Sequence, residues 1–152
     1  MNRGFCLLAQ NNEKTDYVRQ AYALAKSLHR YNTDQKISLI TNDDIPEEWK
    51  EAFDQIIPIP WDDNAEESDW KIQNRWKVYH ASPYDETIVL EADMLILTDI
   101  THWWEELAKR ELFFVSNVRT YRDEIVTSRF YRKTFDANEL PNLYSALHYF
   151  KK

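Results

Sequence analysis

Two carboxylates, Glu91 and Asp93, stand two residues apart directly after residues 86–90 (ETIVL), the most strand-like segment of the chain. In extended backbone, side chains two residues apart point to the same side. Such a pair offers hard oxygen ligands for Mg²⁺ or Mn²⁺, and a cation bound there stabilises a departing diphosphate. The spacing alone favours ordinary solvated acids or ion-pair partners, because so short a motif is common by chance. Two like charges this close nevertheless call for a nearby cation.

The chain has 152 residues, and its single glycine, Gly4, limits how it can bind phosphate. A P-loop, a G-x-G-x-x-G turn and a G-x-S-x-G elbow are all excluded, so a metal or side-chain cations would have to hold phosphate charge. The formal net charge of −7 argues against a nucleic-acid partner. The single cysteine, Cys6, fits a reducing compartment. We see neither a signal-peptide pattern nor an apolar run that could span a membrane, and we expect a cytoplasmic protein.

Strands and helices alternate along the chain, as hydrophobic spacing and turn signals indicate. Apolar residues recur at helical spacing after Thr15, the expected N-cap. The predicted strands are 4–9, 36–41, 56–59, 86–90, 112–115 and 144–150, and the predicted helices are 16–31, 46–53, 69–82 and 102–111. This order predicts one α/β domain, residues 1–152, with a mostly parallel sheet flanked by helices. Ligands of such sheets bind at the carboxyl ends of strands, here 10–12, 42–44 and 91–93.

Residues 84–100 (YDETIVLEADMLILTDI) resemble the strand-plus-DxD block of glycosyltransferases with the GT-A fold. The likeness is strongest to the retaining group that contains glycogenin and the bacterial lipopolysaccharide hexosyltransferases. The family's aromatic residue, apolar run, acid–Ala–acid motif and late acidic–Ile pair match Tyr84, 88–90, 91–93 and 99–100. A second block has the spacing of the family's first helix, at Tyr17, Ala21, Ser27 and Leu28. The resemblance implies a Rossmann-like nucleotide-diphospho-sugar transferase fold.

The resemblance also implies roles for individual residues in a metal-dependent transfer of a sugar from a nucleotide-diphosphate donor. Glu91 and Asp93 would hold Mn²⁺ or Mg²⁺ on the diphosphate, with Ala92 between them at the donor. In the family, the loop after the first strand contacts the nucleoside, which implicates Ala9, Gln10, Asn11 and Tyr17. Arg75, sixteen positions before Glu91, matches a basic residue near the donor phosphates, although a surface arginine covering apolar area is the alternative. Ser145 matches the strand that lines the sugar pocket.

A UDP-sugar is the default donor of this family, and the acceptor is a saccharide, a lipid or a protein. No general base or nucleophile is evident. The chain departs from the family in having Glu91 for the first Asp of the motif and Tyr144 for an Asn of the sugar-pocket strand. The family's third metal ligand is a downstream histidine, and the histidines present are no good substitute: His29, His80, His102 and His148. We expect the second half of the fold, which builds the acceptor side, to be short or missing.

Other functions stay open at this stage. One is a non-catalytic, truncated glycosyltransferase-like module that binds a nucleotide or a protein partner. A nucleotidyltransferase is a weaker hypothesis, because the glycine- and arginine-rich phosphate loop expected of that group is absent. Candidates to line an acceptor groove, with core packing as the commoner use of such rings, are Trp61, Trp70, Trp103 and Trp104. Neighbours on a helix cannot share one face, so one of Trp103 and Trp104 is a candidate contact between two copies of the chain. The acids of 62–69 are interpreted as a solvated face.

Overall fold

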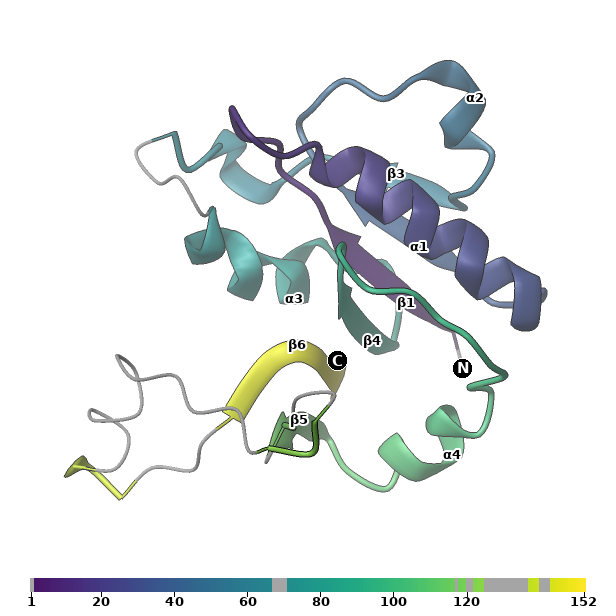
Figure 1. The fold of residues 1–152 in the computed structure, drawn as a ribbon, viewed down its shortest axis with the longest axis vertical. Helices are drawn as coiled ribbons and strands as arrows, with labels where there is room; N and C mark the ends of the chain where they lie inside the picture. Colours follow the sequence, from purple (N-terminus) through teal and green to yellow (C-terminus); the bar gives the residue numbers. More distant parts are fainter. Residues whose placement is uncertain (1, 67–70, 117, 120–121, 125–136, 140–142) are drawn as a thin grey trace.

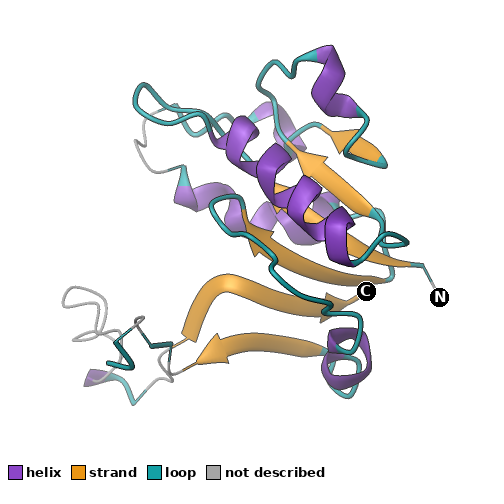
Figure 2. Cartoon of the chain, turned by 45° about the vertical axis from the view of Figure 1, so that its right-hand side comes forward, coloured by secondary structure: helices purple, strands orange, loops and turns teal. Residues whose placement is uncertain are grey.

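The computed structural model describes residues 2–66, 71–116, 118–119, 122–124, 137–139 and 143–152. Within them, six strands form one sheet in the order β3-β2-β1-β4-β6-β5 (Figures 1 and 2). The strands are β1 (Arg3–Leu8), β2 (Ile37–Ile40), β3 (Gln55–Ile57), β4 (Glu86–Glu91), β5 (Leu112–Ser116) and β6 (Leu143–Lys151). Strands β1 to β4 are parallel, whereas β6 runs antiparallel to both β4 and β5. The predicted α/β class with a mostly parallel sheet is confirmed.

Helices flank this sheet and differ in length from the predictions. They are α1 (Tyr17–Tyr31), α2 (Glu47–Lys50), α3 (Val78–Ala81) and α4 (Trp103–Leu107), with the 3-10 helices η1 (Pro60–Asp62) and η2 (Ile72–Lys77). The N-cap of α1 is Asp16 and not Thr15, because the Asp16 carboxylate accepts the backbone N–H of Arg19 at 2.9 Å. Helices α2 and α4 are shorter than the predicted 46–53 and 102–111.

The predicted helix over 69–82 is wrong in its first part. Residues 69 and 70 lie outside the described residues, and 72–77 forms a 3-10 helix that becomes α-helical only at α3. Lys71, which precedes it, has a left-handed φ of 51° and supplies no side-chain cap, so the chain enters this segment without the geometry that starts an α-helix. Arg75 and Trp76 both lie in this tightly wound 3-10 helix, which sets the directions of their side chains.

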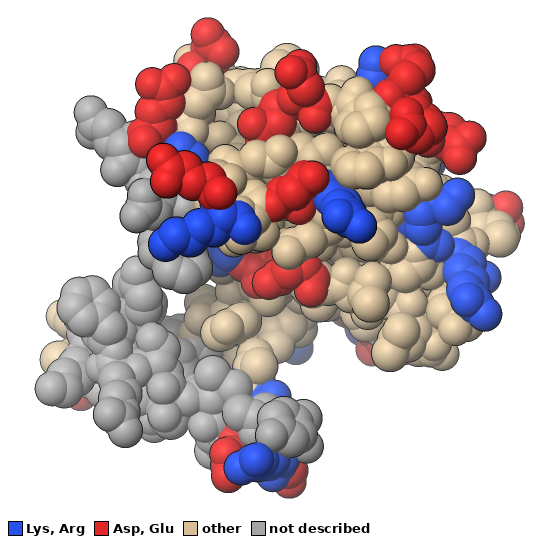
Figure 3. All heavy atoms as spheres, turned by 45° about the horizontal axis from the view of Figure 1, so that its top comes forward, with Lys and Arg blue, Asp and Glu red and all other residues tan. Residues whose placement is uncertain are grey.

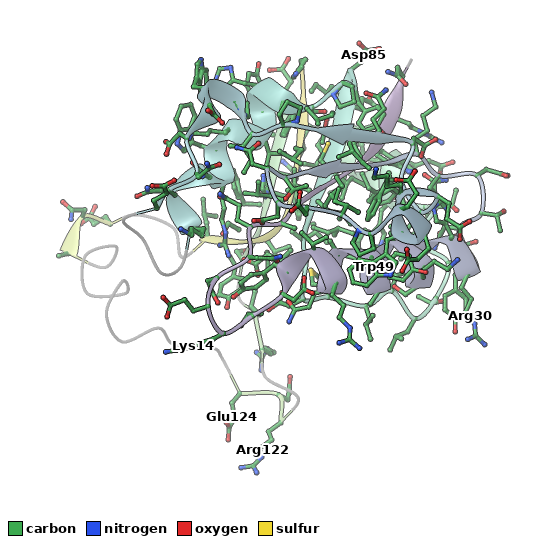
Figure 4. The ribbon with its side chains drawn as sticks, turned by 90° about the horizontal axis from the view of Figure 1, so that it is seen from above. Lys14, Arg30, Trp49, Asp85, Arg122 and Glu124 are labelled. Carbon is green, nitrogen blue, oxygen red and sulfur yellow. The ribbon has the colours of Figure 1, made fainter. Side chains whose placement is uncertain are left out.

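The main core lies between the sheet and α1. The apolar stripe of α1 is fully buried against β1, β2 and β4 and consists of Val18, Ala21, Leu24, Ala25 and Leu28. On the same side Trp104 packs edge-on against Phe5, with ring centroids 5.2 Å apart. Figure 4 shows α1 running from near Lys14 to Arg30 with Trp49 beside it, and Trp49 stacks on Tyr22. Trp104 is therefore a core residue, which is the commoner use of such rings, and it is no longer a candidate to line an acceptor groove.

The single glycine has a packing role. An added Cβ at Gly4 would lie 2.4 Å from the ring of Tyr84, which crosses β1 at this point. Tyr84 is buried, and its hydroxyl shares a hydrogen bond of 2.7 Å with Ser38 of β2. The glycine thus makes room for a ring that joins the loop before β4 to the second strand of the sheet.

Candidate functional site

The carboxyl ends of β1, β2 and β4 meet at one edge of the sheet. Leu8 and Glu91 are register partners at the last positions of β1 and β4, so the loops that follow lie side by side. The backbone N–H of Asn11 donates to the Asp43 carboxylate at 2.6 Å, which ties the loop after β1 to the loop after β2. The three loops predicted to form a site, 10–12, 42–44 and 91–93, therefore lie at the edge where parallel sheets bind ligands.

The side chains of Gln10 and Asn11 shape the loop after β1. The Asn11 side-chain oxygen accepts the backbone N–H of Val18 at 3.0 Å, which holds the loop against the start of α1. Gln10 is almost fully buried; its side-chain nitrogen donates to the Asn64 carbonyl, and its oxygen accepts from Asn74 at 2.6 Å. Ala9 is buried and Tyr17 is half-buried beside them. The four predicted nucleoside contacts thus form one ordered corner of the sheet edge.

Arg75 reaches this edge from η2 and joins it to two strands. Its guanidinium forms an ion pair with the Glu91 carboxylate at the end of β4 and donates a hydrogen bond of 2.6 Å to the Ser145 hydroxyl of β6. Burial lowers the pKa of Arg75, and the charge of nearby Asp93 opposes this shift. An arginine guanidinium stays protonated in such a site. Three predicted site residues from distant parts of the sequence are therefore in direct contact.

Glu91 at the end of β4 and Asp93 just beyond it have the right chemistry for a hard divalent cation but supply few ligands. Glu91 is engaged by Arg75, and Asp93 is exposed. Ala92 between them is buried, which fixes the backbone that carries both carboxylates. Within the described parts of the chain, no group of three or more His, Cys, Asp or Glu side chains is arranged to hold a metal. A cation at this position would complete its shell with phosphate oxygens and water.

His148 supports the segment that carries Ser145. Its ring Nδ1 lies 3.1 Å from the Ser145 carbonyl, and the ring stacks on Phe114 of β5 with centroids 5.1 Å apart. Burial lowers the pKa of His148, and the positive charge of Arg75 lowers it further. His148 is half-buried, and its contacts are those of a structural residue. Tyr144, which replaces an Asn of the resembled family, is 43% exposed at the same end of β6.

A buried polar network, missed in the sequence, holds residues 60–66 against η2. Lys77 is only 3% exposed and pairs with the Asp63 carboxylate at 2.5 Å, and this hydrogen bond lowers the pKa of Asp63. Asn74, fully buried, donates to the Asp63 carbonyl as well as to Gln10, and Lys71 donates to the Ala65 carbonyl at 2.8 Å. Asp63 is exposed, as the interpretation of 62–69 as a solvated face predicts, but its carboxylate also anchors the buried ammonium of Lys77. Polar residues one 3-10 turn apart, at 74 and 77, were the available signal.

The charge on the surface is mixed. On the face in Figure 3, acidic side chains gather over the upper part, and basic side chains lie in smaller groups between them. In the part of the chain that the structure describes, no helix has both the length and the apolar character needed to cross a membrane.

No family profile and no curated protein matches the sequence. Several solved structures are similar to this chain. The galactosyltransferase LgtC, in complex with donor and acceptor sugar analogues, aligns with 97% of this chain and 57% of its own, at 16% identity and a TM-score of 0.64. The glycosyltransferase GlyE of Streptococcus pneumoniae aligns with 99% of this chain and 34% of its own, at 19% identity and a TM-score of 0.59. Core-mannan synthase A of Aspergillus fumigatus, in an Mn/GDP form, aligns with 99% and 59%, at 9% identity and a TM-score of 0.54.

This chain has the GT-A glycosyltransferase fold. Each likeness extends over nearly all of the chain, which confirms the fold implied by residues 84–100 and by the first-helix block. The chain spans little more than half the length of LgtC and about a third of GlyE. At these identities the likeness establishes the GT-A fold, and function has to be argued from the residues at the carboxyl edge.

Proposed function

We propose that this chain binds a nucleotide-diphosphate sugar at the carboxyl edge of β1 and β4 and transfers the sugar to an acceptor. The observation that carries the proposal is the convergence of Arg75, Glu91 and Ser145, from three separate segments, with Asp93 beside them. The fold supports it, because LgtC was crystallised with donor and acceptor sugar analogues on the same framework.

A diphosphate is the ligand that this cluster suits best. The guanidinium of Arg75 is a permanent cation that can give two parallel hydrogen bonds to phosphate oxygens. To do so it has to leave Glu91, and the freed carboxylate then joins Asp93 as a possible ligand of Mn²⁺ or Mg²⁺. Core-mannan synthase A was crystallised with Mn and GDP, which supports a divalent cation here. When bound, such a cation neutralises negative charge on the diphosphate.

The remaining predicted residues divide between the two ends of the donor. Ala9, Gln10, Asn11 and Tyr17 are proposed to contact the nucleoside, with a uridine nucleotide as the default. Ala92 and Ser145 are proposed to lie at the sugar side. The acceptor is left as a saccharide, a lipid or a protein, and a cytoplasmic location and contact between two copies stay predictions from the sequence.

The proposed reaction exchanges one bond at the anomeric carbon for another. The bond from this carbon to the diphosphate oxygen breaks, and its electron pair leaves with the nucleoside diphosphate. The acceptor oxygen forms the new bond and loses its proton to solvent or to the departing diphosphate. Arg75 would lower the barrier by stabilising the negative charge that develops on the diphosphate, which is the largest electrostatic demand of the reaction. Ser145 would keep the guanidinium aimed at this position.

Calorimetric titration of UDP into the protein tests the proposal. We expect binding in the presence of Mn²⁺ that is lost with EDTA and weakened about tenfold or more by Asp93→Ala. Glu48→Ala, which removes an exposed acid of α2, is the matched control and should bind as the unaltered chain does. A screen of UDP-glucose, UDP-galactose and UDP-N-acetylglucosamine for release of UDP then tests turnover. Absence of UDP binding by the folded protein under all conditions would overturn the proposal, and binding without turnover of any donor would leave a non-catalytic module.

A further inference from the structure

Four aromatic rings crowd one surface of η1, η2 and α3, apart from the Arg75 cluster. Trp61 and Trp76 stack with ring centroids 5.4 Å apart and planes inclined by 26°, and His80 stands edge-on against both. Tyr79 packs against His80 and extends the group toward β6. Trp61 and Trp76 are 63% and 60% exposed, so much of each indole is open to water. We call Trp61, Trp76, Tyr79 and His80 the aromatic platform.

The backbone under Trp61 is held in a conformation that tryptophan rarely adopts. Trp61 and Asp62 have φ angles of 65° and 51°, in the left-handed region that disfavours residues with a Cβ. Neighbouring contacts enforce this turn: the Asn42 side-chain oxygen accepts the N–H of Ile59 at 2.8 Å, and Lys77 anchors Asp63. Specific contacts therefore hold the residues on either side of a turn that exposes an indole to solvent. Packing of the core does not require such an exposed, strained residue.

A polar hollow is lined by Asp62, which follows Trp61 in the sequence, and by Gln73 of η2. It has a volume of about 410 Å³, within the range of small-ligand sites, and its lining consists of Asp62, Asp63, Asn64, Ala65, Glu66 and Gln73. Residues one 3-10 turn apart eclipse each other, so Gln73 lies on the same side of η2 as Trp76. The lining offers carboxylate acceptors together with amides that both donate and accept. Among the described residues, those that line the hollow include no lysine or arginine, although Lys77 pairs with Asp63 and Lys71 donates to the Ala65 carbonyl.

We propose that the platform and this hollow bind a neutral saccharide. A pyranose ring has one face of C–H groups that can lie on the electron-rich face of an indole, while its hydroxyls need both donors and acceptors at the edge. Trp61 and Trp76 supply the indole faces, and the acids and amides of the hollow supply the hydrogen-bond donors and acceptors. The carboxylates of Asp62 and Glu66 disfavour phosphorylated or carboxylated sugars by like-charge repulsion. The site requires neither nucleotide nor metal and stands independently of the proposed donor site.

Other occupants suit this surface less well. A specific protein partner engages about 20 to 30 residues on each side, far more than four rings and one hollow. An anionic membrane surface attracts lysine and arginine, whereas the hollow presents Asp62, Asp63 and Glu66. Protein and membrane binding are therefore outcomes that count against the proposal.

The test uses the intact chain without nucleotide or metal. An array of neutral gluco-, galacto- and manno-configured oligosaccharides identifies a binder, whose affinity is then measured by tryptophan fluorescence titration. We expect at least one class of neutral oligosaccharide to bind saturably, and Trp61→Ala and Trp76→Ala each to weaken binding by about tenfold or more. Tyr31→Ala, which removes an exposed tyrosine at the far end of α1, is the matched control and should have no effect. Because both tryptophans are largely exposed, these variants should fold, and thermal melting checks this.

Three results would overturn the proposal. They are the absence of any neutral oligosaccharide binder, binding that survives in the double variant Trp61→Ala/Trp76→Ala, and preference for anionic glycans or for vesicles of anionic phospholipid. Should Trp61→Ala melt early, Trp76→Ala decides alone. UDP titration of the same variants separates the two sites: loss of saccharide binding with intact UDP binding assigns the defect to the platform. A chain that binds saccharide but not UDP would sink the donor-site proposal and leave this one standing.

Discussion

The guanidinium of Arg75 lies against the carboxylate of Glu91, the last residue of β4. In the structure, the cation proposed to hold a diphosphate and one acid proposed to hold a metal are therefore partners of each other. In the proposed function, a diphosphate would draw Arg75 away and release Glu91 for the metal. Nucleotide and metal should therefore bind cooperatively, each tightening the other by the same factor.

Arg75→Gln should change the two affinities in opposite directions. Without the guanidinium, Glu91 is free beside Asp93, so Mn²⁺ alone should bind about fivefold tighter, while UDP in the presence of Mn²⁺ should bind about tenfold more weakly. Calorimetry with Mn²⁺ alone and with UDP plus Mn²⁺ measures both values. Arg30→Gln, on the exposed end of α1, is the control. A fall in both affinities would show that Arg75 merely supports the fold of the site.

The Asp63–Lys77 pair should respond unequally to removal of its two members. Lys77 is 3% exposed whereas half of the Asp63 side chain faces solvent. Asp63→Ala leaves a buried ammonium without its partner, while Lys77→Met leaves a carboxylate that water can solvate. We expect Asp63→Ala to lower the Tm more than Lys77→Met does, and the double variant to melt above Asp63→Ala alone. Equal losses from the two single changes would contradict the burial seen for Lys77.

Gly4→Ala should destabilise the protein even though alanine is ordinarily tolerated better than glycine in a strand. The new methyl group would lie 2.4 Å from the Tyr84 ring, and the ring has no free space because it is buried and bonded to Ser38. We expect a loss of about 2 kcal/mol in the free energy of unfolding, measured by urea denaturation. In a Tyr84→Leu background the same change should cost less than about 1 kcal/mol, since the obstructing ring is gone.

Acid should weaken the fold partly through His148. Its pKa in the folded chain lies below the ordinary value of 6.5, because burial and Arg75 disfavour the imidazolium. As the pH falls below this value the unfolded chain binds the proton first, so stability is complete above about pH 7 and declines toward pH 5. His148→Gln should flatten this part of the curve of unfolding free energy against pH. An unchanged slope in the variant would exclude His148 as the source.

The sequence by itself determined the local features of this protein. Hydrophobic spacing predicts α1 and the strands. The buried stripe of a helix and the buried face of a strand each consist of residues that are close in sequence, so their spacing is visible there. The acid–Ala–acid motif after the best strand, with Tyr84 before it, pointed to the GT-A fold and to 91–93 as a site. The single Gly4 excluded whole classes of phosphate-binding loop, and the excess of acids argued against a nucleic-acid partner.

Only the tertiary structure decided which side chains meet. Arg75 touches Ser145 across 70 positions of sequence, and the contact depends on a 3-10 helix that the periodicity of 69–82 presented as an α-helix. Trp76 of the same 3-10 helix lies on the surface, where 60% of it is exposed. The burial of Lys77 beside Asp63 could not be predicted either, because a charged residue is expected to face solvent unless its partner is known. Such contacts depend on how separate elements pack, and no local pattern records that.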